Sequence, residues 1–322
     1  MSHSTTRPKV TVCVATYNQQ AYIKDCLLSI LMQDCPADLE ILVGDDFSTD
    51  RTDSIISEVA NVYPGRLTIP DRAGNLGPSQ NYQDMIRRAS GDYIAHIDGD
   101  DYWMPNKLAA QLAHFAEHPE CVAVYSNAHI ISNGGQLVGI FNNPQPETFD
   151  TEYLLRRGNF LNHSSMLYRA QFKSVITELS GSFIDYRMHL RLSRHGMLGY
   201  VNQDLVAYRS GTSTSMIKHI PYKVNDMYWE AITDPEILPR FEASSVSAQI
   251  YFYAHILYNA VRKNRLPYAR HWAVRIRSEH RNKSISIFVR SVLLIPSIFW
   301  RSLRRKIATT LSGSRFYPLY ER

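Results

Sequence analysis

The stretch Ile94-Ala95-His96-Ile97-Asp98-Gly99-Asp100-Asp101 is the most informative part of this sequence. Mostly apolar residues of strand character lead directly into three carboxylates. Like charges at this spacing repel, and no basic residue lies beside them in the sequence. A bound divalent cation would compensate the charge, because hard cations take carboxylate oxygens and keep coordination sites open for phosphate. The alternative is a solvated acidic turn at the end of a strand.

Strand and helix patterns alternate around this stretch. Short apolar runs, rich in β-branched residues, predict strands at 9–15, 39–43, 67–69 and 93–97. Apolar spacing and capping residues predict helices at 23–31, from a cap at 48–50 to 60, and at 81–89. This alternation is typical of an α/β fold, a Rossmann-like and mostly parallel sheet flanked by helices, whose ligands bind beyond the carboxyl ends of the strands. No GxGxxG motif follows the first strand and no Walker motif is present, which argues against a dinucleotide-binding domain.

From about residue 118 the alternation of strand and helix patterns becomes less regular. The sequence predicts strands at 122–126, around 130–140 as a pair, at 198–201 and at 205–208. A helix is expected over 183–194, ended by Gly196. From Tyr222 onward the pattern is helical and strongly aromatic. We therefore expect an α/β domain followed by a C-terminal helical extension.

The composition is that of a globular protein. The chain has 322 residues, of which 44% are hydrophobic and 20% charged. Its most apolar region, near 285–300, is interrupted by Arg290 and Pro296, and we expect it to be too short to span a membrane. The first nine residues do not resemble a signal peptide. The four cysteines show no metal-ligand spacing and predict free thiols in a reducing compartment, the cytoplasm.

The charge is distributed unevenly along the chain. Residues 1–261 carry 20 Lys and Arg against 28 Asp and Glu, whereas residues 262–322 carry 15 Lys and Arg against only two acidic residues. A basic tail on an acidic body indicates an anionic partner such as a membrane surface or nucleic acid. The two parts of the chain are therefore expected to have different functions.

Several motifs in order resemble glycosyltransferase family 2, whose members are inverting enzymes with the GT-A fold. They are Val14-Ala15-Thr16-Tyr17-Asn18, Gly44-Asp45-Asp46-Phe47-Ser48-Thr49-Asp50, Asn75-Leu76-Gly77 with Asn81, and Gly91-Asp92-Tyr93-Ile94 leading into Asp98-Gly99-Asp100-Asp101. The resemblance covers roughly residues 8–215. It implies a GT-A catalytic domain over 1–215, with a nucleotide-sugar part at about 8–115 and an acceptor part at about 116–215. Residues 216–322 would form a helical, basic C-terminal region.

The resemblance also implies roles at the donor site. Asp46 would bind the nucleobase with the loop Ala15–Tyr17, since a carboxylate accepts the imide N–H of uracil or thymine. Asp100 would hold Mn²⁺ or Mg²⁺, and Asp98 would contact the ribose or support the metal. The other nucleotide-sugar contacts implied are Ala15, Tyr17, Asn18, Asn75, Asn81 and Arg209. The alternative for Asp45 and Asp46 is a pair of acidic turn residues stabilised by the dipole of the following helix.

Inversion also requires a base that removes the proton of the acceptor hydroxyl. Residues 183–192 match the family's Glu-Asp segment, which opens a helix, with Ile184 in place of the Glu. The match implies that Asp185 is the base, although the neighbouring carboxylate is missing. The alternative is structural, because an Asp in the first turn of any helix is favourable.

Three further residues are candidates around this site. Arg209, followed by Ser213 and Ser215, resembles a loop that covers the diphosphate; the alternative is a strand-end Arg on a solvated loop. His163 lies where the family lines the acceptor pocket, and a structural histidine is the alternative. Trp103 would stack on a sugar ring unless it packs in the core.

The segment 284–306 mixes large apolar residues with arginines. On a helical projection, four arginines lie within about 100° of one another, and Phe288, Val292, Ile295, Phe299 and Leu303 lie on the other side. This pattern favours a peripheral membrane contact at an anionic surface. The alternative is a helix packed on the catalytic domain with a basic exterior. Nucleic acid is disfavoured because no nucleic-acid-binding motif accompanies the charge.

These features predict a metal-dependent, inverting glycosyltransferase. It would move a sugar from a nucleotide donor, most simply a UDP-sugar, to a hydroxyl of a glycan or lipid-linked acceptor in surface polysaccharide synthesis. It would work in the cytoplasm, at the inner face of the cytoplasmic membrane if the tail binds lipid. One alternative is a nucleotidyltransferase, but no Gly-rich basic phosphate loop follows the first strand. The other is a catalytically silent scaffold that binds nucleotides or glycans, which the missing Glu before Asp185 favours.

Overall fold

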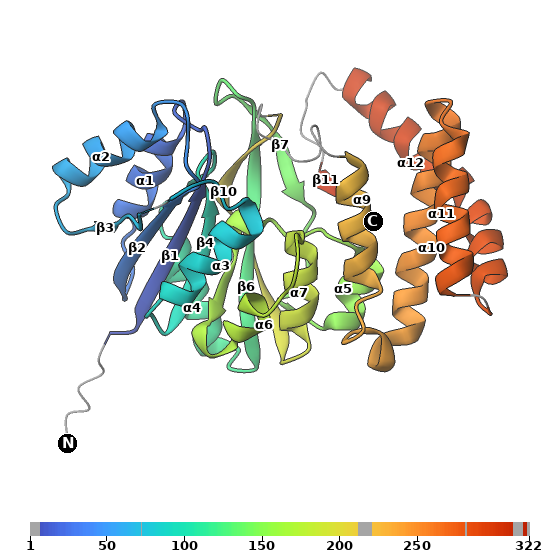
Figure 1. Ribbon diagram of the computed structural model, residues 1–322, viewed down its shortest axis with the longest axis horizontal. Coiled ribbons are helices and arrows are strands. Elements are labelled where there is room, and N and C mark those ends of the chain that lie inside the picture. The colour runs from blue at the N-terminus through green and yellow to red at the C-terminus, as the bar shows by residue number, and fades with distance from the viewer. Residues whose placement is uncertain (1–6, 72, 212–220, 281, 312–317, 321–322) are drawn as a thin grey trace.

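The computed structural model of the protein describes residues 7–71, 73–211, 221–280, 282–311 and 318–320. Figure 1 shows a central sheet with helices on its faces and a group of helices, α9 to α12, at the C-terminal side. The described strands form one sheet, whose main path runs β11-β7-β6-β9-β4-β1-β2-β3. This is the α/β architecture with a helical extension that the sequence predicts.

The N-terminal half of the sheet is parallel. It consists of β1 (Lys9–Thr16), β2 (Asp38–Asp45), β3 (Leu67–Thr68) and β4 (Tyr93–Asp98), with β1 paired to both β2 and β4. The β1 sequence is almost continuously apolar or β-branched, as expected for a strand covered on both faces. The strands predicted in this half are all present.

The second half of the sheet is mixed, and two of its strands are longer than the sequence pattern indicates. Its elements are β5 (Tyr102–Trp103), β6 (Cys121–Ile131), β7 (Leu137–Asn142), β8 (Thr148–Phe149), β9 (Leu167–Arg169), β10 (Met197–Arg209) and β11 (Pro318–Tyr320). The strands predicted at 198–201 and 205–208 are one strand, β10, with register shifts around Asp204. The prediction of a break was wrong because a bulge lets the polar residues 202–204 remain within a strand. Likewise, 122–126 and the first of the strands expected near 130 are both part of β6.

Two helical layers cover the two faces of the sheet. One layer has α1 (Ile23–Leu31), α2 (Thr52–Val62) and α4 (Lys107–Glu117), and its core includes β-strand residues of both halves. The other has α3 (Pro78–Arg88), α5 (Thr151–Arg157), α6 (Ser174–Thr177), α7 (Asp185–Ser193) and the short 3-10 turns His163–Ser165 and Ala170–Phe172. Helix α3 begins earlier than predicted because Pro78 suits a first helical position. Helix α7 begins at Asp185 rather than 183.

The C-terminal helices share a core with the second layer. They are α9 (Pro221–Ile232), α10 (Leu238–Arg262), α11 (Leu266–Glu279) and α12 (Ser284–Leu311). Trp229 packs on Trp272 with ring centroids 5.6 Å apart, and Tyr228 packs on Tyr186 of α7 at 4.9 Å. The helical region is therefore joined to the α/β part by a continuous apolar cluster. The boundary predicted at 215, with Ser213 and Ser215, lies outside the described residues.

Helix α12 departs from one sequence expectation. Among the described residues, Ser284–Arg304 is the one helical segment long and apolar enough to cross a membrane by length and composition. The prediction that this region is too short is therefore wrong, because the helix continues through Pro296 without ending. Helix α12 also packs along α10. The four cysteines are all buried free thiols, as predicted.

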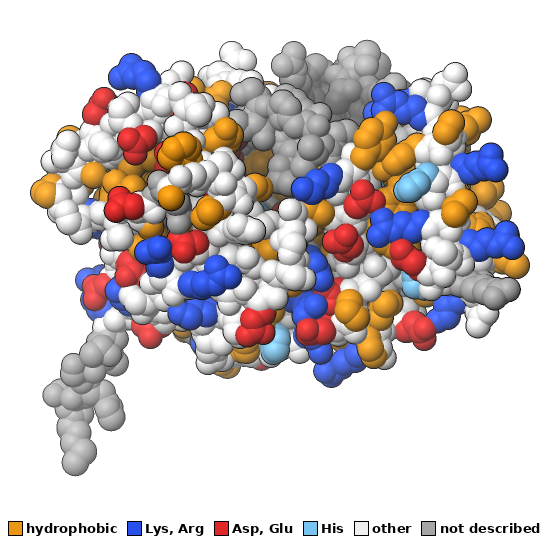
Figure 2. All heavy atoms as spheres, viewed as in Figure 1, with side chains coloured by type: hydrophobic (Ala, Val, Ile, Leu, Met, Phe, Trp, Pro, Cys, Tyr) orange, Lys and Arg blue, Asp and Glu red, His pale blue; other side chains and the backbone are white. Residues whose placement is uncertain are grey.

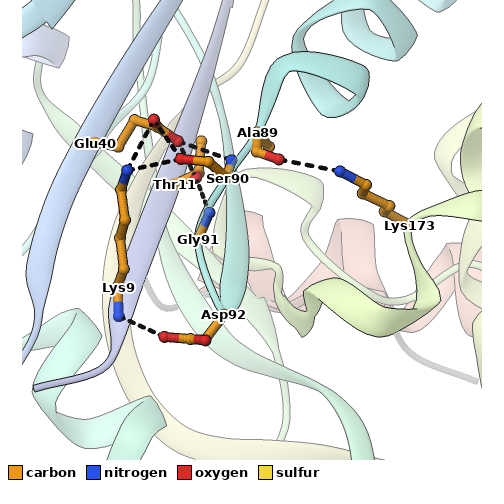
Figure 3. Close-up of polar contacts among 8 residues, drawn as sticks. All are labelled: Lys9, Thr11, Glu40, Ala89, Ser90, Gly91, Asp92 and Lys173. Atoms are coloured by element: carbon orange, nitrogen blue, oxygen red, sulfur yellow. Dashed lines mark hydrogen bonds and ion pairs between the residues drawn. The ribbon is translucent and has the colours of Figure 1, made fainter. Parts of the chain in front are cut away.

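A polar network closes the amino end of the parallel strands (Figure 3). The Glu40 carboxylate accepts hydrogen bonds from Lys9 Nζ at 3.0 Å, from the Ser90 backbone N–H at 3.0 Å and from the Thr11 hydroxyl. Burial acts to raise the pKa of Glu40, but these hydrogen bonds outweigh it and lower the pKa to about 2. Asp92 in turn accepts from the Lys9 backbone N–H at 2.8 Å. The charges at this end of the sheet are thus paired within the protein.

Candidate active site

The carboxyl ends of β1, β2 and β4 meet at one edge of the sheet. In the parallel register, Ala15 of β1 lies beside Gly44 of β2 and Asp98 of β4. The Gly99 N–H donates to the Ala15 carbonyl at 2.8 Å. A Cβ at position 99 would come within 2.5 Å of the Gln19 side chain, so only glycine fits between the two acidic residues. The motifs recognised in the sequence are therefore brought together by strand pairing.

A cavity of about 1050 Å³ opens at this edge. Its walls come from the strand ends, from α3, α5 and α7, and from the C-terminal helices α9, α10 and α12. Of the residues predicted from the sequence, those that line it are Ala15, Tyr17, Asp46, Asn75, Asn81, Asp98, Asp100, His163, Asp185 and Arg209. Residues from parts of the chain that are far apart thus face one common space.

Asp46 lies at the β1–β2 side of the cavity and is held by a loop. Its carboxylate accepts the backbone N–H groups of Leu76 at 2.7 Å and Gly77 at 2.9 Å. The Asn75 side chain donates to the Asp46 carbonyl at 2.8 Å, and the Asn81 side chain donates to the Gly44 carbonyl at 2.7 Å. The two asparagines therefore fix the loop and strand that position Asp46. A carboxylate has further lone pairs for a ligand N–H beyond these two bonds.

The acidic residues at the end of β4 and just after it occupy different environments. Asp98 is 45% exposed, and its Oδ1 lies 3.0 Å from His96 Nε2. Asp100 is half-buried and also lines the cavity. Asp101 is buried and accepts the Arg209 backbone N–H at 2.8 Å and the Ser164 hydroxyl at 2.5 Å. Asp101 therefore anchors β10 and the turn at 163–165, while Asp98 and Asp100 face the open space.

The donor set fits Mn²⁺ or Mg²⁺. Burial, and then the negative charges of Asp100 and Asp98, raise the pKa of Asp101 well above its usual range. Burial is the main cause of that shift, and the two neighbouring carboxylates add to it, so a bound cation would favour the ionised carboxylates at this turn. Carboxylate oxygens next to an open cavity are the ligands that these hard cations prefer. Asp98 and Asp100 are thus the residues that would hold the metal.

Asp185 lies at the first position of α7 and faces the same cavity. Its Oδ1 accepts the Asn159 side-chain amide at 2.9 Å and the Tyr186 backbone N–H at 2.8 Å. Burial in the cavity wall raises the pKa of Asp185 to about 6 despite these hydrogen bonds, and the charge of Asp98 adds to the rise. A carboxylate with such a pKa is ionised at neutral pH and is a better base than an exposed Asp. Ile184, which stands where the family has Glu, also lines the cavity.

Three histidines lie behind Asp98 and Asp185, and they were not predicted as a group. The His96 and His163 rings stack with centroids 3.8 Å apart, and His189 lies 5.6 Å from His163. Burial, followed by the other histidines, lowers the pKa of His163 well below its usual range, and that of His189 to about 3. Both rings are therefore neutral. His163, Asp185 and His189 each place one ligand atom within 4.8 Å of the other two.

The histidine group contains several unsatisfied polar atoms. His163 Nδ1 and both ring nitrogens of His189 are buried without a hydrogen-bond partner among the described residues. One part of this arrangement had a signal in the sequence, since His189 lies four residues after Asp185 on the same helix face. His163, predicted as a weak acceptor contact, is thus part of the wall beside the candidate base.

Arg209 lines the cavity but is held by the protein backbone. Its guanidinium donates to the carbonyls of Asp100 at 3.0 Å, Ser132 at 2.9 Å and Asn133 at 3.0 Å. It also lies 4.3 Å from the centroid of the Tyr22 ring. Arg209 therefore places positive charge beside the acidic turn while fixing the shape of that turn.

Two residues predicted for the site do not line the cavity. Trp103 is 3% exposed, donates from Nε1 to the Ser164 carbonyl at 2.8 Å and packs under Lys107, so it belongs to the core. Asn18 turns toward the 48–49 loop, where its side chain accepts the Thr49 N–H at 2.8 Å. Trp103 is thus buried away from the cavity, whereas Asn18 is half-buried beside the loop that follows β2.

The comparisons with known proteins agree with this geometry. The family described as Glycosyl transferase family 2 matches residues 11–175, which is more than half of the chain. The protein belongs to glycosyltransferase family 2. Its GT-A fold is shared with a mannosyltransferase from Pyrobaculum calidifontis, solved in complex with GDP-Man and Mn²⁺, at a TM-score of 0.55 and 18% identity, over 92% of this chain and 84% of that one.

Curated relatives extend the similarity beyond the family domain. An uncharacterized protein of Mycobacterium tuberculosis is 29% identical over 69% of this chain, and this chain spans 64% of that relative's length. A UDP-Glc:alpha-D-GlcNAc-diphosphoundecaprenol beta-1,3-glucosyltransferase of Escherichia coli is 25% identical over 80% of this chain and 96% of its own length. The similarity therefore includes part of the C-terminal helical region in at least the second case.

Proposed function

We propose that this protein is a metal-dependent, inverting glycosyltransferase that uses a nucleotide-sugar donor, specifically a UDP-sugar. The observation that carries the proposal is that Asp185, with a pKa of about 6, faces the same cavity as Asp98 and Asp100. A base for the acceptor and carboxylates for a metal are the two parts that an inverting transfer needs. The name of the Escherichia coli relative, which includes UDP-Glc, supports uracil as the nucleobase of the donor.

The donor would bind along the edge of the sheet. The Asp46 carboxylate would accept the imide N–H of the uracil ring, and Tyr17, which is 40% exposed beside the cavity, would cover the ring. Asp98 and Asp100 would hold Mn²⁺ or Mg²⁺, which supplies Lewis-acid stabilisation of the charge on the departing nucleoside diphosphate. Arg209 adds fixed positive charge beside the same acidic turn.

Asp185 would act as the general base. The acceptor oxygen attacks the anomeric carbon on the side away from the nucleotide, its proton passes to the Asp185 carboxylate, and the bond from that carbon to the phosphate oxygen breaks. Asn159 keeps the carboxylate oriented through its hydrogen bond to Oδ1. The configuration at the anomeric carbon is inverted, so an α-linked donor gives a β-linkage. The acceptor would be a hydroxyl of a glycan or lipid-linked glycan in surface polysaccharide synthesis, with His163 beside it.

The same proposal includes a membrane contact through the segment 284–306. Figure 2 shows hydrophobic and basic side chains gathered over the C-terminal helices. On α12 the exposed apolar residues are Ile285, Val289, Val292, Leu293, Phe299 and Trp300. Arg290 and Arg304 are exposed on the same helix. Apolar side chains flanked by cations suit an anionic lipid surface. The protein would then work in the cytoplasm at the inner face of the membrane.

Liposome flotation tests the membrane contact. Leu293 is 71% exposed, and Leu293→Glu should abolish flotation with vesicles that contain anionic lipid. Val62→Glu changes a residue that is 70% exposed on α2 in the catalytic part, and should leave flotation unchanged. If the intact protein does not float, the membrane contact is wrong, and the proposed transfer reaction is unaffected.

Slow hydrolysis of a panel of UDP-, dTDP- and GDP-sugars, with Mn²⁺ and with EDTA, tests the central proposal. We expect metal-dependent release of UDP from one donor, and loss of that release in Asp100→Ala. Calorimetry with UDP should accompany the assay. Binding of UDP with no turnover in the presence of any acceptor would favour a silent scaffold instead, and failure to bind any nucleotide would reject the proposal.

A further inference from the structure

One wall of the cavity differs from the others in its chemistry. It is built by α9, α10 and α12, and its lining residues include Tyr251, Tyr258 and Arg301. Among the described residues of this wall there is no carboxylate, whereas the wall at the strand ends has several. A ligand in the cavity thus meets an acidic metal-binding side and an aromatic, basic side.

Arg301 is the cation of the helical wall. It is half-buried on α12 and donates to the Tyr251 hydroxyl at 2.6 Å, with its guanidinium carbon 5.6 Å from the Tyr251 ring centroid. Its other contact is a long one of 3.5 Å to the Ser297 hydroxyl. None of the ion pairs between described residues includes Arg301. The arginine is therefore oriented by neutral groups, and its charge is available to an anion.

Arg157, at the end of α5, also lines the cavity without an acidic partner among the described residues. Its Nε is buried and has no hydrogen-bond partner in the described part of the chain. A buried donor left unsatisfied is costly, so this atom is suited to an acceptor oxygen brought by a ligand. Arg209 differs, because three backbone carbonyls already accept its hydrogen bonds.

We infer that Arg301 and Arg157 form an anion subsite for the acceptor, and that the anion is the phosphate that links a glycan to its lipid carrier. The inference rests on the proposed transferase function and names the acceptor class. Arginine binds phosphate oxygens through paired N–H donors. Tyr251 and Tyr258 offer aromatic faces to a sugar in the same wall. The side of α12 that does not line the cavity carries Leu293 and Trp300, 71% and 60% exposed, so a lipid and its phosphate would meet one helix.

The subsite is tested by binding of a short lipid phosphate to the full chain. Geranyl diphosphate is titrated in the presence of EDTA, so that no metal ion can bridge its phosphates to the acidic residues. Geraniol serves as the neutral counterpart, and geranic acid as the carboxylate counterpart. We expect the diphosphate to bind at least tenfold more tightly than either counterpart. Arg301→Gln and Arg157→Gln should each weaken its binding about tenfold. Tyr251→Phe, which removes the hydroxyl that orients Arg301, should weaken it about threefold.

Arg277→Gln is the matched control, since Arg277 is exposed on the neighbouring helix α11, does not line the cavity and lies outside the segment 284–306. It should leave the affinity unchanged, and thermal unfolding should show that the Gln variants are folded. Equal losses in Arg277→Gln and Arg301→Gln, or equal binding of geranic acid, would overturn the inference. A parallel titration with UDP and Mn²⁺ reports on the proposed function. If UDP binds and Arg301→Gln has no effect, only the subsite is wrong. If UDP does not bind but the Arg301 effect is present, only the proposed function is wrong.

Discussion

The two ends of the parallel sheet shift the pKa values of their carboxylates in opposite directions. At the amino end, donors from Lys9, Thr11 and Ser90 lower the pKa of Glu40 to about 2 (Figure 3). At the carboxyl end, burial raises the pKa of Asp185 to about 6 and that of Asp101 well above its usual range. One end therefore favours the charged state of its acid, and the other opposes it. Perturbations of the second kind collect at functional sites, because catalytic acids and bases need pKa values that suit their task.

The largest effect on transfer activity is expected for a substitution of Asp185, at the carboxyl end of the sheet, and it should leave stability intact. Asp185→Asn keeps the size of the side chain and removes the base, so transfer to an acceptor should fall about 10³-fold while donor binding is unchanged. Because the folded-state pKa of Asp185 lies above its unfolded value, the ionised carboxylate opposes folding at pH 7. We therefore expect the variant to unfold at the same temperature or a higher one. If the variant keeps its transfer activity, Asp185 is not the general base.

The next effect concerns the nucleobase. Asp46→Asn should raise the donor KM about tenfold with a smaller change in kcat, since a hydrogen bond to a charged acceptor contributes about 1.5–3 kcal/mol. Asp45→Asn is the matched control, because Asp45 precedes it directly and does not line the cavity. Steady-state kinetics with the donor identified by hydrolysis measures both. Equal effects of the two substitutions would mean that the loop, rather than the Asp46 carboxylate, determines donor affinity.

The pH profile gives a further, smaller effect. Transfer needs ionised Asp185, whose pKa is about 6, so kcat/KM should be level above that pH and fall tenfold per unit below it. The Asn159 hydrogen bond acts to lower this pKa. Asn159→Ala should therefore move the acidic limb of the profile to higher pH. A profile that stays level down to pH 5, or a limb that does not move in the variant, would contradict the assignment of the base.

Residues next to strand ends were the predictable part of the site. Tyr17 and Asp46 directly follow strands, while Asp98 is the last residue of β4 and Asp100 lies two residues further on. Parallel strands end at one edge, so the local pattern was enough to bring these residues together. Whether a side chain at such a place faces the cavity is a separate matter. Trp103 follows the acidic turn closely, yet its ring is directed into the core by a hydrogen bond to the Ser164 carbonyl.

Residues that meet through distant packing could not be predicted. His96, His163 and His189 come from a strand, a 3-10 turn and a helix, and their stacking depends on how α7 packs on the sheet. The helical wall of the cavity depends in the same way on the packing of α10 and α12. Likewise, the polar residues 202–204 are a break in hydrophobic pattern, and only strand pairing with β6 shows that β10 continues through them.

The smallest effect on turnover is expected for a substitution at the amino end of the sheet. There the comparison predicts a loss of stability with no change in catalysis. Glu40 has a folded-state pKa of about 2, below its unfolded value, so it stabilises the fold above about pH 4.5. That stabilisation is lost as the pH falls toward 2. Glu40→Gln should lower the free energy of unfolding by about 2 kcal/mol at pH 7, less than the full pKa shift implies because the side chain is 20% exposed. Denaturant unfolding of both proteins measures the difference, which should shrink between pH 4.5 and 2.

Glu58→Gln is the control. The Glu58 side chain is 63% exposed on α2, and its ion pair with Arg51 is long at 3.8 Å. This substitution should change the free energy of unfolding by less than about 0.5 kcal/mol. A loss of transfer activity in folded Glu40→Gln would break the comparison, because it would show that the paired charges of the amino end also act on the site.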